Sequence, residues 1–261
     1  MKSKRVFSSL VASTILASTL LFSLSSCQQR TSYKISKITS SRTLIDSTFD
    51  QNPSQEAINV LAPYKKEIHE KVYKVIGTAA KTMTSGAPES LLGNLVSDIL
   101  RQAAIKVIGK PADMGLMNVG GLRASLPKGP ITNGRIFKIL PFENALVVLT
   151  LTGVQMQQLM EQIAATKGQG ISNARIVMTH DWKLVSTTVA GKAIDPKKTY
   201  TVATIDYLAG GNDGLNVLAE SDKKIESEAK LRDIALDYVK EMTKNHKVID
   251  AKIEGRISFK K

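Results

Sequence analysis

The amino-acid sequence predicts an α+β fold, a single domain in which helices flank a mixed β-sheet. Two observations support this: apolar residues recur at helical spacing in several segments, and short strand-like runs lie between those segments. Strands at hairpin spacing that are interrupted by helices favour a mixed sheet over a regular βαβ array. With 43% hydrophobic and 23% charged residues among 261, the composition excludes a collagen, a long coiled coil and a wholly disordered chain.

The predicted elements follow one another without a second linker or an internal repeat. Helices are predicted over residues 58–72, 88–103 and 226–244. A further helix begins at a capping box formed by Thr152 and Gln155. The predicted strands cover residues 137–140, 145–151, 175–178, 184–189, 200–205 and 256–259. We therefore expect one domain over residues 54–261.

The chain begins with a targeting segment. A basic start is followed by an apolar run, diluted by serines, over residues 7–24. The order Leu-Ser-Ser-Cys over residues 24–27 fits a lipobox, in which cleavage leaves an acylated cysteine at the new N-terminus. We predict a lipoprotein signal peptide over residues 1–26, lipidation of Cys27, and attachment to the bacterial cell envelope facing the periplasm. An ordinary secretory peptide, or a weak membrane helix with a free thiol, is the alternative.

Residues 27–53 are predicted to form a lipid-anchored flexible tether. They are rich in Ser, Thr, Gln and Lys, and their few apolar residues follow neither a helical nor a strand period. The whole chain has 36 Lys and Arg against 23 Asp and Glu, a net charge of +13. These basic residues are spread along the chain without the interleaved aromatics of single-stranded nucleic-acid binders, so we expect no nucleic-acid polymer as a partner.

The sequence offers no self-sufficient hydrolytic or metal centre. The three histidines, His69, His180 and His246, lie outside the spacings that metal hydrolases use. There is no nucleophile elbow of the Gly-x-Ser-x-Gly type, and lipidation would consume Cys27. We therefore predict no catalytic and no metal-binding residue in this chain.

Two glycine-rich turns carry the strongest functional signal. Residues 118–123, Asn-Val-Gly-Gly-Leu-Arg, follow the apolar run 114–117, and residues 209–214, Ala-Gly-Gly-Asn-Asp-Gly, follow a predicted strand. Glycines at strand ends permit positive φ and let a ligand approach the backbone closely. Arg123 and Asp213 add a cationic donor and a carboxylate acceptor. Taken alone, each turn favours the interpretation as a plain tight turn.

Two aromatic residues, Phe142 and Tyr207, each lie next to a loop in a chain with only 5% aromatic residues. Such a pair can clamp a flat heterocycle between two π faces. A core position for Phe142 is the alternative interpretation.

Six short runs, taken together, resemble the C-terminal, substrate-binding domain of 5'-nucleotidases and UDP-sugar hydrolases. They cover residues 89–94, 118–123, 140–144, 151–153, 198–203 and 207–214. Their order and spacing are similar to those of that domain over nearly all of residues 55–260, which implies the same α+β fold.

The resemblance implies a nucleotide as ligand. The substrate-binding residues that it implies are Asn118, Arg123, Phe142, Asn144, Gly170, Tyr207 and Asp213. Phe142 and Tyr207 would sandwich the base, with the two asparagines contacting the base or polar groups near it. The arginine would hold phosphate, the aspartate would accept hydrogen bonds from ribose hydroxyls, and the glycine would offer a backbone contact. These residue types suit those partners, because a guanidinium binds phosphate well and a carboxylate binds vicinal hydroxyls well.

Two departures from the family pattern limit the expected activity. Gly86 stands where family members tend to carry a further phosphate-binding arginine, and the nearest basic residue is Lys81. The family's N-terminal metallophosphoesterase domain, whose paired divalent metals activate water, has neither room nor ligands in this chain.

We therefore expect the nucleotide-binding half of a 5'-nucleotidase-type hydrolase of nucleotide catabolism. It would be inactive alone and would act with a separate metallophosphoesterase chain that carries the divalent metals. One alternative is a nucleoside- or nucleotide-binding lipoprotein without a catalytic role. The other is a degenerate interaction domain whose pocket no longer binds ligand.

Overall fold

The computed structural model describes residues 33–260. The chain divides into two compact units, Met1–Ser54 and Gln55–Lys261. The described part of the first unit is irregular apart from a short 3-10 helix, η1 (Ser47–Gln51). The predicted signal peptide and Cys27 lie outside the described residues. Within residues 33–260, no helix has the length and apolar character needed to cross a bilayer.

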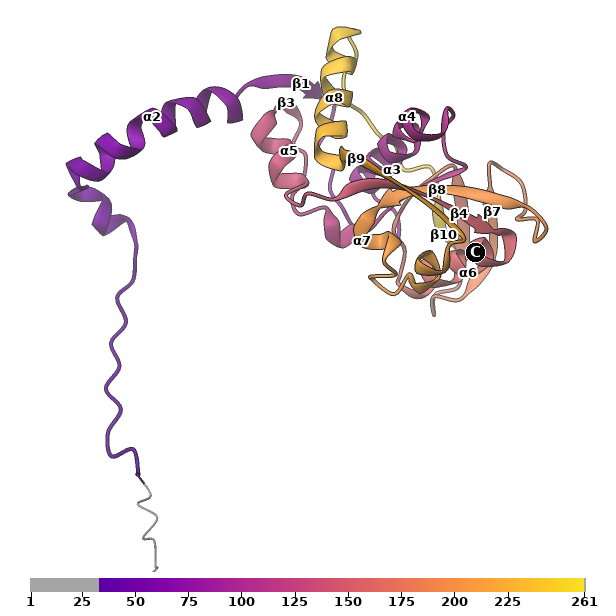
Figure 1. The fold of residues 1–261 in the computed structure, drawn as a ribbon, viewed down its shortest axis with the longest axis horizontal. Helices are drawn as coiled ribbons and strands as arrows, with labels where there is room; N and C mark the ends of the chain where they lie inside the picture. The colour runs from indigo at the N-terminus through magenta and orange to yellow at the C-terminus, as the bar shows by residue number, and fades with distance from the viewer. Residues whose placement is uncertain (1–32, 261) are drawn as a thin grey trace, which may run out of the picture. The chain divides into compact units, whose positions relative to one another are not determined.

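The second unit is built on a five-stranded mixed sheet, which confirms the predicted fold class (Figure 1). Its strands, in spatial order, are β5 (Gly170–Ser172), β2 (Met114–Met117), β8 (Thr199–Ile205), β4 (Ala145–Thr152) and β9 (Lys223–Lys230). β2 runs parallel to β8, and the other neighbours are antiparallel. Every residue of β2 is buried and most of β4 is buried, so these strands supply the centre of the hydrophobic core.

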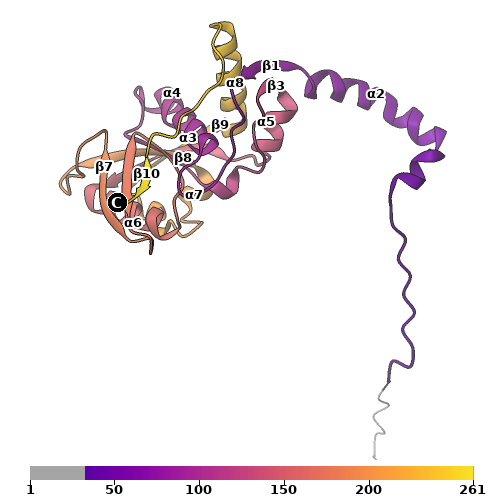
Figure 2. The same ribbon diagram turned by 180° about the vertical axis from the view of Figure 1, so that it is seen from behind.

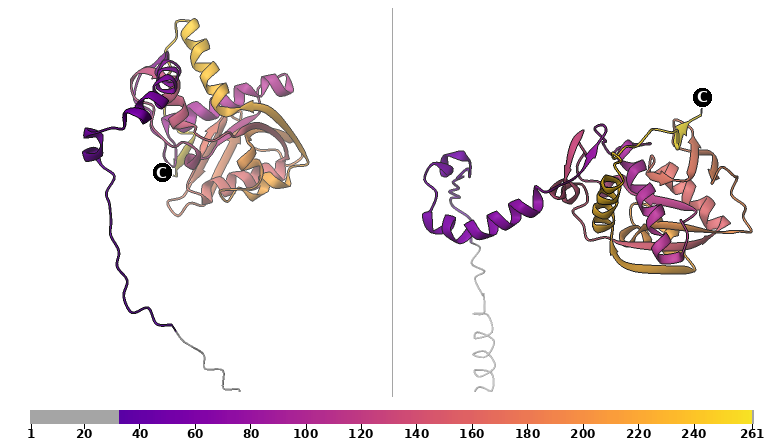
Figure 3. Two further views of the ribbon diagram at one scale, coloured as in Figure 1. Left: turned by 60° about the vertical axis from the view of Figure 1, so that its left-hand side comes forward. Right: turned by 90° about the horizontal axis from the view of Figure 1, so that it is seen from above.

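Helices pack on this sheet and complete the core. α3 (Leu91–Ala103) contacts β2, β5 and β8, and α6 (Gly153–Ala165) contacts β4 and β8. α8 (Leu231–Lys244) lies beside α3 (Figure 3). The capping box predicted for α6 is confirmed. The Thr152 hydroxyl accepts a hydrogen bond from the Gln155 amide, and Gln155 Oε1 accepts one from the Thr152 amide.

Two smaller sheets and several short helices complete the unit. One sheet has the order β10 (Ile257–Phe259), β6 (Ala174–Met178), β7 (Leu184–Val189) (Figure 2), and the other pairs β1 (Val75–Ala79) with β3 (Gly129–Thr132). The remaining helices are α2 (Gln55–Val72), α4 (Ile105–Ile108), α5 (Asn133–Ile139), α7 (Asp206–Ala209), η2 (Val119–Gly121) and η3 (Asn216–Glu220). α2 forms where the apolar spacing predicts a helix, but none of its residues is buried.

The strand predicted over residues 137–140 is wrong, because residues 137–139 form the end of α5 and Leu140 is its C-cap. Thr132 caps this helix, and its hydroxyl accepts a hydrogen bond from the Arg135 amide. Ile136 and Ile139 are both buried and are three residues apart, which is the spacing of one helix face. Three apolar residues within a run of four do not distinguish a short helix from a strand.

The helix predicted from Glu226 begins instead at Leu231, because residues 223–230 form β9. This strand lies at the edge of the sheet and pairs with β4. Only part of it is covered: Ile225 is half-buried, while its lysine and glutamate neighbours are exposed. Edge strands commonly carry charged residues, and that composition masks the strand pattern in the sequence.

Gly170 lies where β5 meets α3. A Cβ atom on Gly170 would lie 2.7 Å from the carbonyl oxygen of Gly93, a backbone atom that cannot swing away. We expect Gly170→Ala to lower the free energy of unfolding by about 1–3 kcal/mol, the usual cost of overpacking, as measured by urea denaturation. Gly86→Ala is the matched control, because nothing lies within 4 Å of a Cβ atom at that position. Equal stability of the Gly170 variant and the wild type would contradict this close packing.

Candidate functional site

Three loops meet at one edge of the five-stranded sheet. β2 and β8 are adjacent and parallel, with Met114 opposite Val202, so their carboxyl ends lie at the same edge. β4 is antiparallel to β8, with Leu146 opposite Ile205, so its amino end lies at that edge as well. The two glycine-rich turns and the loop before β4 are thereby brought together.

These loops enclose a pocket of about 350 Å³. It is lined by Asn118, Gly120, Gly121, Arg123, Phe142, Asn144, Tyr207 and Asp213. All of the residues predicted to bind substrate, except Gly170, therefore line a single pocket. Phe142 is 50% exposed and Tyr207 is 44% exposed, so neither ring is part of the hydrophobic core.

Gly170 does not line the pocket. It lies in β5, opposite Met117 in the antiparallel pairing with β2. Its neighbour Gln169 has a clear structural role, because Gln169 Oε1 accepts a hydrogen bond of 2.8 Å from the Val119 amide. No nearby sequence pattern marks Gln169, since 50 positions separate it from the turn that it anchors.

Asp213 joins the two glycine-rich turns. Its Oδ1 accepts a hydrogen bond of 2.8 Å from the Tyr207 hydroxyl, and its Oδ2 accepts one of 2.6 Å from Asn118 Nδ2. Asn118 is only 4% exposed, and its Oδ1 is buried without a hydrogen-bond partner among the described residues. The carboxylate thus fixes the position of the aromatic ring relative to the first turn.

The second turn takes its shape from left-handed backbone and from one amide side chain. Gly211, Asp213 and Gly214 have φ of 81°, 56° and 76°. Asn212 is not in the left-handed region. Its Nδ2 instead donates a hydrogen bond of 2.7 Å to the Tyr207 carbonyl. A non-glycine residue in the left-handed region is uncommon, although aspartate is one of those that tolerate it best.

Arg123 is one of the exposed residues that line the pocket. Its backbone amide donates a hydrogen bond of 2.9 Å to the Ile139 carbonyl, which attaches the first turn to the end of α5. Its side chain is exposed, and Nη1 donates a bond of 3.2 Å to the Gly120 carbonyl. A guanidinium has five N–H donors, so several remain available to an anionic ligand.

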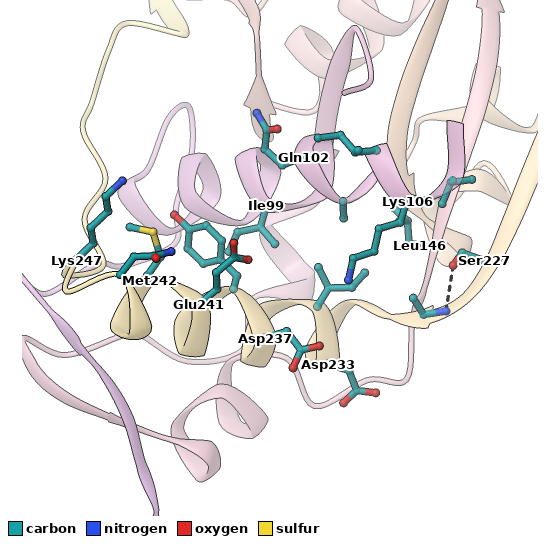
Figure 4. A pocket seen from close by; sticks show the side chains of 17 residues that line it. Ile99, Gln102, Lys106, Leu146, Ser227, Asp233, Asp237, Glu241, Met242 and Lys247 are labelled. Carbon is teal, nitrogen blue, oxygen red and sulfur yellow. Dashed lines mark hydrogen bonds between the residues drawn. The ribbon is translucent and has the colours of Figure 1, made fainter. Parts of the chain in front are cut away.

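A second hollow, between α3, α4 and α8, holds none of the predicted site residues (Figure 4). Its volume is about 560 Å³. Apolar side chains such as Ile99 and Met242 line it, and three carboxylates of α8, from Asp233, Asp237 and Glu241, stand beside them. Lys106 and Lys247 also line this hollow, so its charge is mixed. The pocket at the sheet edge is the better candidate for a nucleotide, because it gathers both glycine-rich turns, both aromatic rings and Arg123.

In the part of the chain that the structure describes, no three His, Cys, Asp or Glu side chains cluster as metal ligands would. His180 instead stacks on Phe259, with ring centroids 4.6 Å apart and planes inclined by 11°. The described pocket is lined by two aromatic side chains, two asparagines, an arginine and an aspartate, together with two glycines.

A model of the family described as 5'-nucleotidase, C-terminal domain, matches residues 75–220. The chain belongs to this family. The match includes both glycine-rich turns and the loop before β4, so all three walls of the pocket are parts of the 5'-nucleotidase C-terminal domain.

In three similar proteins, the region that matches this chain is part of a longer chain. The trifunctional nucleotide phosphoesterase protein YfkN of Bacillus subtilis is 28% identical over 233 residues, which cover 82% of this chain and 16% of YfkN. Cell wall protein Lmo0130 of Listeria monocytogenes is 27% identical over 234 residues, which cover 80% of this chain and 30% of Lmo0130. The crystal structure of a 5'-nucleotidase precursor from Thermus thermophilus matches with a TM-score of 0.67 and 29% identity, over 78% of this chain and 43% of that one. This chain spans less than half the length of each of them.

The hydrogen bond between Tyr207 and Asp213 gives a titration test. The Asp213 carboxylate accepts this hydrogen bond and carries a negative charge. Both effects raise the pKa of Tyr207 above its usual value. Asp213→Asn removes the charge, so we expect the Tyr207 phenol to titrate at lower pH than in the wild type. The absorbance difference between each protein and its Tyr207→Phe counterpart isolates this phenol from the other tyrosines. An unchanged titration midpoint would show that the carboxylate does not hold the hydroxyl.

Proposed function

We propose that this chain is the nucleotide-binding half of a 5'-nucleotidase-type hydrolase, with hydrolysis of the phosphate ester performed by a separate metallophosphoesterase chain. The observation that carries the proposal is the convergence of two half-exposed aromatic rings, an arginine and an aspartate on one pocket. Membership of the 5'-nucleotidase C-terminal domain family supports a nucleotide as the ligand.

The pocket offers one partner for each part of a nucleotide. Phe142 and Tyr207 both line the pocket, and stacking on aromatic rings suits any nucleobase. Asp213 offers carboxylate oxygens to the ribose hydroxyls, and Arg123 offers a guanidinium to the phosphate. Asn118 and Asn144 supply amide groups beside the base.

The partner chain in this proposal supplies the metals. Paired divalent metals polarise a phosphate ester and activate water. The described residues gather no such ligand set, and in this proposal the metal centre therefore lies on another polypeptide. This chain would hold the nucleoside and present its phosphate.

We also propose that the chain acts at the bacterial cell envelope, held by a lipid on Cys27 and facing the periplasm. The lipobox over residues 24–27 supports the anchor. The similarity to a cell wall protein supports an envelope location.

If one chain binds the nucleotide and another hydrolyses it, a mixing experiment has a definite expected result. The purified chain alone should not release phosphate from AMP, and release should begin when a metallophosphoesterase that copurifies with it is added together with a divalent metal. Phosphate release is measured over time, with the partner alone as the control. Robust metal-dependent turnover by the lone chain would refute the division. Tight binding without hydrolysis in any mixture would instead identify a binding protein.

Removal of either stacking ring should weaken nucleotide binding. We expect Phe142→Ala and Tyr207→Ala each to lower the affinity for AMP by about 1–3 kcal/mol, the usual contribution of one base–aromatic stack, in calorimetric titrations. Tyr64→Ala is the matched control, because Tyr64 is an exposed aromatic residue of α2 that does not line the pocket. If both pocket variants bound AMP as the wild type does, the pocket would be vestigial.

A further inference from the structure

Arg232, in the first turn of α8, lies against the loop that carries Phe142. Its side chain is only 12% exposed, whereas the Glu143 side chain that it contacts is 76% exposed. The Nε atom of Arg232 is buried and has no hydrogen-bond partner among the described residues. A buried charge with an unsatisfied donor lowers stability, so a requirement for a stable fold alone does not explain this residue.

The guanidinium group of Arg232 makes three contacts, one with α5 and two with the loop of residues 141–144. Its central carbon lies 4.3 Å from the centre of the Phe137 ring, which is a cation–π contact. Nη1 donates a hydrogen bond of 3.2 Å to the Pro141 carbonyl, and Nη2 forms a 3.1 Å ion pair with Glu143 Oε1. These contacts fix the orientation of the Arg232 guanidinium plane as well as its position.

The contacts surround Phe142 without involving its ring. Pro141 is held on one side of it and Glu143 on the other, and the next carbonyl, that of Asn144, accepts a 2.9 Å bond from the Leu231 amide. Phe142 itself is half-exposed and lines the pocket. Since the backbone on both sides of Phe142 is tied to the start of α8, the direction of its ring depends on that attachment.

We propose that Arg232 is a positioning residue that sets the Phe142 ring at the angle required to stack on a base. This inference rests on the proposed function, because it concerns the same pocket. It adds a residue that does not line the pocket and that acts only through the loop of residues 141–144.

A double-mutant cycle in the full-length chain tests this role. The variants are Arg232→Met, Phe142→Ala and their combination, with AMP as the probe in calorimetric titrations. We expect Arg232→Met to weaken AMP binding about tenfold when Phe142 is present and less than about twofold when Phe142 is replaced, since coupled residues are not additive. Arg232→Lys should restore part of the affinity, because an ammonium can make one of the two polar contacts but not both in the same geometry.

Arg175→Met is the matched control. Arg175 also binds a loop through backbone carbonyls, since its Nη1 donates to those of Glu254 at 2.7 Å and Gly255 at 3.1 Å, but it does not line the pocket. Its loss should leave AMP affinity unchanged. An equal loss of affinity from Arg232→Met with and without Phe142 would overturn the positioning role.

A second measurement does not depend on any ligand. Hydrogen–deuterium exchange of the amides in residues 140–145 should be faster in Arg232→Met than in the wild type, and unchanged in Arg175→Met. Unchanged exchange in Arg232→Met would overturn the inference. If the wild type binds no AMP, the proposed function fails, and the exchange rates alone decide whether Arg232 orders this loop.

Discussion

The parallel pairing of β2 with β8 is the constraint on which the pocket depends. Two adjacent strands that run in the same direction end at the same edge of a sheet. Here each of them is followed by a glycine-rich turn. β4 enters from that edge and brings the loop with Phe142 and Asn144. Asn118 and Asp213, which touch across the pocket, are 95 positions apart in the sequence. Their meeting is a property of the sheet topology and not of either turn.

Asp213 fixes the two glycine-rich turns relative to each other. Both of its carboxylate oxygens are engaged, one by Tyr207 and one by Asn118, so the two turns are tied together before any ligand arrives. The bond to Asp213 also orients the Asn118 amide and leaves its Oδ1 buried without a partner among the described residues, which costs stability. A carboxylate oxygen can accept more than one hydrogen bond. In the proposed function, ribose hydroxyls therefore bind Asp213 without breaking the bridge.

Sequence patterns predicted the parts of this protein whose signal is local. The apolar stripe of α3, the Thr152 capping box and the glycine-rich turns could all be recognised from neighbouring residues. β9 was missed because an edge strand rich in charged residues lacks the alternation that marks a half-buried strand. Gln169 and Arg232 were missed for a different reason: each anchors a loop that is distant in the sequence, and nothing near them marks that contact.

The exposure of the pocket residues indicates which end of the proposed ligand faces solvent. Asn118 is buried, the two rings are half-exposed, and the Arg123 side chain is exposed. A nucleotide whose base lies between the rings and whose phosphate meets Arg123 therefore carries its phosphorus atom on the solvent side. Hydrolysis by two metals requires that those metals reach the phosphate oxygens. A pocket that enclosed the phosphate would hold the ligand more firmly, but it would exclude a second protein from the bond to be broken. An exposed Arg123 is therefore compatible with the proposed division between a binding chain and a catalytic chain.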